Sequence, residues 1–123
     1  MMQRLFSKMF PLIAWTAWTP TRTGWTDVGA PTVTARYCRV AALTFFQMSI
    51  VPGTTTATVE GTSQFSLPIT ADANALAGDA VMMNITTLIA VGNCAMDLTN
   101  SLCYVPTQGA TGNTLTISGY YET

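Results

Sequence analysis

Histidine is absent from this 123-residue chain, and lysine occurs once, at Lys8. The lack of histidine removes the commonest general base and metal ligand of proteins. The three cysteines, Cys38, Cys94 and Cys103, show no CxxC spacing and have no histidine to complete a zinc motif. We therefore predict no catalytic residues, no metal site and no cofactor. We expect free thiols, although Cys94 and Cys103 could also face each other across a hairpin.

Two pairs of acidic residues offer alternatives to that prediction. Asp72 and Asp79 lie in one predicted loop, where turn formation is the simple role and a calcium site is the alternative. A calcium loop needs more oxygen ligands at closer spacing. Glu60 and Asp97 would act as glycosidase carboxylates only if the fold brought them together. The sequence therefore favours a protein that is not an enzyme.

Long apolar runs are also missing. No window approaches the roughly 20 apolar residues that a membrane-spanning helix needs, so we predict no membrane insertion. Residues 9–18 are the most apolar stretch, and Arg4 and Lys8 precede them as in a signal peptide. Pro11 and three large aromatic residues interrupt this run, which argues against a signal peptide. We interpret residues 1–18 as an N-terminal arm, extended or partly helical.

Charge of either sign is scarce, at 9% of residues against a usual share of about 25%. All five basic residues lie in the first 39 positions, and five of the six acidic residues lie after them. Five scattered bases are too few for a nucleic-acid interface, so we expect no nucleic-acid partner. Because a soluble monomer would carry more surface charge, we predict that much of the surface contacts other subunits.

The segment that organises the chain is residues 33–51, which we predict to be two antiparallel strands and a tight connection. Its polar and apolar residues alternate with a period of two, as in paired strands. Phe46, Met48 and Ile50 share one face of the second strand, and Phe45 and Gln47 share the opposite face. About eight to ten short strands are predicted in all, and such a pattern is typical of an antiparallel β-sandwich of jelly-roll type. Residues 19–123 would form this domain, with the threonine-rich residues 54–60 as an edge or solvent-facing strand.

Two tryptophans at the start of the domain, Trp18 and Trp25, are candidate surface or interface aromatics. Large aromatic side chains in a short stretch serve as core residues, as interface anchors or as platforms for carbohydrate. The sequence leaves these three roles open.

Several stretches, in their order along the chain, resemble a β-structured domain that is frequent in bacteriophage virion proteins, above all at the ends of tail fibres. The matching stretches are W-T-P-T-R-T-G (18–24), T-A-R-Y-C-R-V (34–40), F-F-Q-M-S-I-V-P-G-T-T (45–55), F-S-L-P-I (65–69), A-G-D (77–79), A-M-D-L-T-N-S-L-C-Y (95–104) and T-L-T-I-S-G-Y-Y (114–121). The resemblance implies a homotrimeric β-sandwich on the virion, assembled in the host cytoplasm, with no catalytic residues.

Two functions are compatible with that resemblance. The first is a short tail fibre or spike that contacts a host receptor, for which a cell-surface glycan is one candidate. The alternative is a capsid decoration (cement) protein that stabilises the phage head. In either case we expect the arm to attach the trimer to other tail or capsid proteins. The candidate docking residues are Arg4, Phe6, Lys8, Phe10, Leu12, Ile13 and Trp15.

Overall fold

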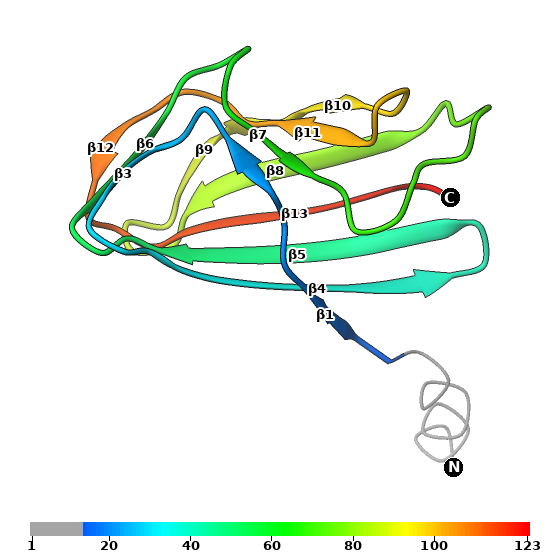
Figure 1. The fold of residues 1–123 in the computed structure, drawn as a ribbon, viewed down its shortest axis with the longest axis horizontal. Helices are drawn as coiled ribbons and strands as arrows, with labels where there is room; N and C mark the ends of the chain where they lie inside the picture. Colours follow the sequence, from blue (N-terminus) through cyan, green and yellow to red (C-terminus); the bar gives the residue numbers. More distant parts are fainter. Residues whose placement is uncertain (1–13) are drawn as a thin grey trace.

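The computed structural model describes residues 14–123, which form thirteen strands in three antiparallel sheets (Figure 1). The predicted all-β sandwich is thereby confirmed. The strands are β1 (Thr16–Trp18), β2 (Arg22–Thr23), β3 (Thr26–Val28), β4 (Thr32–Val40), β5 (Leu43–Val51), β6 (Thr55–Thr58), β7 (Gln64–Ser66), β8 (Gly78–Asn84), β9 (Ile89–Asn93), β10 (Ala95–Asp97), β11 (Leu102–Tyr104), β12 (Gln108–Thr111) and β13 (Leu115–Glu122).

The central hairpin is present as predicted. Strands β4 and β5 are the longest of the fold, at nine residues each, and pair from Val40 opposite Leu43 to Thr32 opposite Val51. Two residues connect them, and the first, Ala41, has a left-handed conformation with φ of 54°. A positive φ at such a position lets the chain reverse within a short loop.

The hairpin lies inside a six-stranded sheet of order β1-β4-β5-β13-β8-β9. Strand β13, the last of the chain, lies between β5 and β8 and pairs with both over most of its length. A four-stranded sheet of order β10-β11-β7-β2 and a three-stranded sheet of order β12-β6-β3 form the second layer. In Figure 1, β4 and β5 lie at the bottom of the view and the strands of the smaller sheets lie above them.

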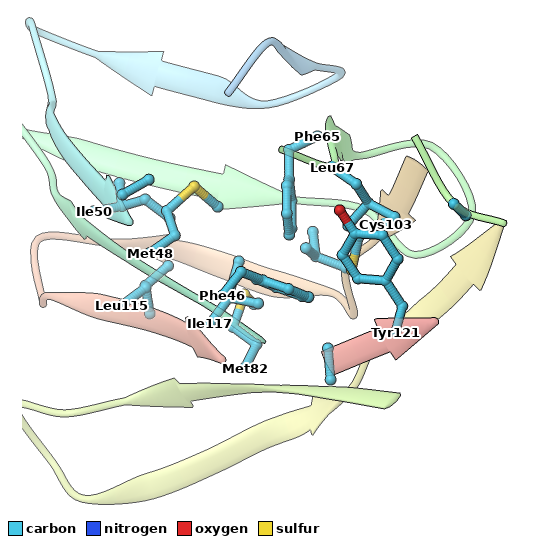
Figure 2. Packing of buried hydrophobic residues seen from close by; sticks show 14 residues of the cluster. Phe46, Met48, Ile50, Phe65, Leu67, Met82, Cys103, Leu115, Ile117 and Tyr121 are labelled. Atoms are coloured by element: carbon cyan, nitrogen blue, oxygen red, sulfur yellow. The ribbon is translucent and has the colours of Figure 1, made fainter. Parts of the chain in front are cut away.

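The core lies between these two layers. Figure 2 shows side chains of the six-stranded sheet that point toward those of the smaller sheets. The largest buried side chains of the six-stranded sheet come from alternate positions of β5, β8 and β13, and they are Phe46, Met48, Ile50, Met82, Leu115, Ile117 and Tyr121. Phe65, Leu67 and Cys103 face them from the second layer. The faces predicted for Phe46, Met48 and Ile50 are therefore confirmed.

Gly119 allows β13 and β8 to approach each other beneath the Phe46 ring. A Cβ atom at this position would lie 2.6 Å from the Cβ atom of Ala80 and still closer to the carbonyl oxygen of Asp79. Gly119 is also directly opposite Phe46 on β5. The missing side chain therefore leaves room for the aromatic ring above the sheet.

Tyr121 ties the last strand to the loop after β7. Its hydroxyl donates a hydrogen bond of 2.6 Å to the carbonyl oxygen of Ile69 and accepts one of 3.0 Å from the Ile69 N–H. Burial raises the pKa of Tyr121 to about 12, with a smaller contribution from Tyr37 and an opposing one from the hydrogen bond to Ile69. The phenol is thus held neutral, and both polar groups of Ile69 have a partner.

The threonine-rich strand is not an edge strand, and this part of the sequence prediction was wrong. Strand β6 lies in the middle of its sheet, with Thr56 and Thr58 buried. The Thr56 hydroxyl donates to Asp27 Oδ1 at 2.9 Å, and the Thr58 hydroxyl donates to the carbonyl oxygen of Pro106 at 2.6 Å. Buried hydroxyl groups are tolerated when they are hydrogen-bonded, and here the partners come from distant segments.

The boundary expected after residue 18 falls within the sheet. Strand β1 pairs with β4, with Trp18 opposite Ala35, so residues 16–18 belong to the domain. The predicted docking residues Arg4, Phe6, Lys8, Phe10, Leu12 and Ile13 lie outside the described residues.

Candidate interaction surface

The face of the six-stranded sheet that points away from the core is the candidate functional surface. Side chains alternate across a strand, so the residues between the core positions point outward. In the four central strands these residues stand directly opposite one another in three rows. The rows are Cys38, Phe45, Tyr120 and Asp79; Arg36, Gln47, Ser118 and Val81; and Thr34, Ser49, Thr116 and Met83. We call these twelve residues the outer face.

An aromatic hollow of about 420 Å³ occupies one half of the outer face. Trp15, Phe45 and Tyr120 line it, together with polar groups that include Asp79 and Ser118. The Phe45 and Tyr120 rings are 6.1 Å apart between centroids and tilted by 41°. Each of these two side chains is 37% exposed, although a large aromatic side chain gains most from burial.

A chain of contacts holds Trp15 on this face. The Arg36 guanidinium donates two hydrogen bonds to Gln47 Oε1, at 3.0 and 2.7 Å. The same guanidinium lies 4.5 Å from the centroid of the Trp15 ring, within the range of a cation–π contact. Arg36 and Gln47 are direct cross-strand neighbours, so the sheet register fixes their partnership. The expected docking residue Trp15 is therefore held against the outer face.

The other half of the outer face is lined by hydroxyl groups. A second hollow of about 410 Å³ lies there, and Thr34, Ser49 and Thr116 are among its lining residues. Arg36, Gln47 and Ser118 line this hollow too, and Gln47 and Ser118 also line the aromatic one. Only Arg36 and Asp79 among the twelve outer-face residues carry a charge. The outer face thus combines aromatic area, neutral hydrogen-bonding groups and little charge.

A third hollow, of about 340 Å³, is formed by other parts of the chain. Tyr104 and Pro106 supply its apolar surface, and Glu60 and Asn93 supply polar groups. An aromatic ring beside a carboxylate and an amide can bind a polar ligand by stacking and hydrogen bonding. None of its lining residues belongs to the outer face.

The two candidate surface tryptophans pack against the core. Trp18 is half-buried, and its ring centroid is 6.3 Å from that of Phe46 and 6.4 Å from that of Phe65. Trp25 is also half-buried, and its indole N–H donates to the carbonyl oxygen of Gln64 at 2.9 Å. The Arg22 guanidinium lies 5.0 Å from the Trp25 ring and pairs with Asp27 at 3.0 Å. These contacts fix the start of the domain on the sandwich.

Two of the acidic residues that the sequence singled out, Asp72 and Asp97, accept hydrogen bonds within turns. Asp72 accepts a hydrogen bond from the Asn74 N–H, at 2.8 Å. Asp97 accepts from both the side-chain and the backbone nitrogen of Asn100, and these bonds lower the pKa of the Asp97 carboxyl group. In residues 14–123 no three His, Cys, Asp or Glu side chains gather in a way that could hold a metal ion.

The described part of the chain, residues 14–123, contains no helix that is long and apolar enough to cross a bilayer.

The three cysteines are free thiols. Cys103 is fully buried, and its pKa is raised, first by a hydrogen bond with Cys94 and then by burial. The Cys94 and Cys103 side chains are thus neighbours, which was one of the two possibilities considered from the sequence. No disulfide joins them. Cys38 lies on the outer face and is 5% exposed.

Sequence reasoning placed these outward residues on faces opposite the core but did not single them out as a site. The alternation in residues 33–51 was the available signal, because it separates Phe45 and Gln47 from Phe46 and Met48. Residues 14–123 form an antiparallel β-sandwich in which no second sheet among the described residues covers the outer, partly aromatic face of the large sheet. Comparisons with models of protein families, with curated proteins and with solved structures found no match.

Proposed function

We propose that the protein is a bacteriophage virion structural protein. It forms a homotrimeric surface component of the short tail fibre or spike type, contacts a host receptor, and performs no catalysis. The proposal begins from the resemblance of seven ordered stretches to a phage virion domain.

The main support for this proposal is the position of the stretches that resemble the phage domain: several of them coincide with strands of the sandwich. Residues 34–40 lie in β4, residues 45–51 in β5, and residues 95–104 form the β10–β11 hairpin. Residues 114–121 cover most of β13, the strand that joins the two halves of the large sheet. The antiparallel all-β fold is also the one that the resemblance implies.

The surface is consistent with a protein that works in an assembly. The outer face is broad, aromatic and nearly uncharged, and large exposed patches of this kind mark contact sites. Host contact needs a second, separate surface, and the hollow around Tyr104 has the aromatic and polar groups that a glycan requires.

Immunolabelling of purified phage particles tests the proposal directly. Antibodies against residues 14–123 should label intact particles, and the protein should appear among the proteins of gradient-purified virions. A few labels at the tail would support the fibre or spike role. Many labels over the head would favour the alternative, a capsid decoration protein. Absence of the protein from purified virions would overturn both.

Deletion of residues 1–14 tests the attachment role expected for the arm. This deletion leaves β1 and the whole sandwich in place. We expect the truncated protein to form trimers of near-normal stability and to be missing from particles. If trimers are lost on deletion, the arm is part of the oligomeric domain and its docking role must be dropped.

A further inference from the structure

We propose that the outer face is the surface through which each chain contacts a second copy of itself. This inference rests on the proposed trimer and adds to it the location of the subunit interface. The occupant of the aromatic hollow would then be a neighbouring subunit, and host contact would use other surfaces.

The size of the whole six-stranded sheet, of which the outer face is the middle, approaches what a stable interface requires. Its strands hold 41 residues, and each residue covers roughly 16 Å² at a strand spacing of about 4.8 Å and a rise of about 3.3 Å. The sheet face therefore measures on the order of 650 Å². A specific interface of standard size buries about 800 Å² on each partner. A smaller ligand such as a single sugar would leave most of this face uncovered.

The composition of the outer face is that of an interface centre. Interface centres are depleted in charge and enriched in aromatic residues and arginine. Trp15, Phe45 and Tyr120 lie together here, and tryptophan, tyrosine and arginine are the residues that most often dominate binding energy. The hydroxyl groups of the second hollow can hydrogen-bond across the interface without the cost of burying a charge.

Arg36, the single cation of the outer face, already has contacts that reduce the cost of burying it. Arg36 has two hydrogen bonds to Gln47 and a cation–π contact with Trp15 before any partner arrives. A guanidinium that keeps such contacts loses less on desolvation than a free one, and its side chain is already ordered. Asp79 stands at the end of its row on β8, away from the middle of the sheet.

The decisive test places a charge in the middle of the outer face. Ser118 is exposed and points outward from β13, so the substitution Ser118→Glu leaves the core untouched. The matched control is Val59→Glu, because Val59 is 55% exposed, lies after β6 and is not part of the outer face. Both variants and the full-length wild-type chain are compared by sedimentation equilibrium at micromolar concentration, and their folding is checked by circular dichroism.

We expect the wild type and Val59→Glu to sediment as trimers. Ser118→Glu should sediment as a folded monomer, with a dissociation constant raised by about 100-fold or more because a charge would be buried without a partner. If the Ser118→Glu variant is folded and still trimeric at the concentrations at which the wild type is trimeric, the interface is placed wrongly. The virion proposal would not be affected by that result. A monomeric wild type would overturn this inference and the trimer together, whereas particle labelling tests the virion role separately.

Hydroxyl-radical footprinting of the wild type supplies a second measurement that does not depend on how a variant folds. Phe45 and Tyr120 are each 37% exposed in the single chain, so both can react with the radical there. In the assembled protein they should be oxidised at least several-fold more slowly than in the same protein diluted to monomer. Equal oxidation in the two states would contradict the proposed interface.

Discussion

Replacement of Phe46 by alanine should remove one of the largest buried side chains of the core. Phe46 is 1% exposed, and its ring contacts Trp18, Phe65 and Tyr121 at centroid distances of 5.9 to 6.3 Å. Truncation of a buried phenylalanine to alanine typically costs about 3–5 kcal/mol in free energy of unfolding. The cost depends on how far the surroundings can collapse into the cavity.

At this position the surroundings can move little. Gly119 has no side chain to fill the space, and Ala80, next to it on β8, has only a methyl group. The ladders of β5, β13 and β8 hold the backbone on that side. We therefore expect a loss in the upper half of the range, about 4–5 kcal/mol.

Urea unfolding followed by tryptophan fluorescence measures this loss. Val59→Ala, at a side chain that is 55% exposed, is the control and should change stability by less than about 0.5 kcal/mol. The variants are compared at equal chain concentration, because assembly adds a concentration-dependent contribution. If Phe46→Ala costs less than about 1.5 kcal/mol, the ring is not packed as described and the inner face of β5 is wrongly assigned.

Four further predictions concern Tyr121, the cysteines and the Asp72–Asp79 loop. Tyr121→Phe should cost about 1–3 kcal/mol, because it removes two hydrogen bonds to the half-buried backbone of Ile69, each worth about 0.5–1.5 kcal/mol; an unchanged urea midpoint would contradict this role. The folded protein keeps the Tyr121 proton up to about pH 12, whereas the unfolded chain loses it near an ordinary pKa of about 10, so stability should fall as pH rises between these values, and less steeply in Tyr121→Phe. Under native conditions a thiol reagent should modify Cys38 and Cys103 far more slowly than in denaturant, since both are buried, and modification of all three thiols at the denatured rate would refute their placement. Addition of a chelator should leave the melting temperature unchanged; a drop of several degrees would reveal a calcium site in the Asp72–Asp79 loop.

Local pattern was sufficient for the central hairpin and the fold class. The alternation of residues 33–51 predicted both strands and the inward face of β5, because side chains of successive residues must point to opposite sides of a strand. Turn signals are local in the same way, as at residues 97–100, where the Asp97 carboxylate accepts hydrogen bonds from Asn100. The period-two alternation also separates Leu115, Ile117 and Tyr121 from Ser118 and Tyr120 within β13.

Burial of polar side chains could not be read from the same pattern. Thr56 and Thr58 lie in the threonine-rich residues 54–60, for which the sequence predicts an edge or solvent-facing strand. Their burial depends on Asp27 and Pro106, which are 29 and 48 residues away in the sequence. No local signal reports whether such a distant acceptor is present.

The sequence by itself determined that this chain is an antiparallel β-sandwich and which side chains share a face of each long strand. Only the tertiary structure decided that, within residues 14–123, the second layer covers one face of the large sheet and no other sheet covers the opposite face. It also brought Trp15, Arg36 and Gln47 together and placed Tyr120 beside Phe45. The physical reason is that a period of two assigns residues to faces strand by strand. The assembly of strands into a surface depends on pairings such as that of Phe45 with Tyr120, 75 positions apart, which no local pattern encodes.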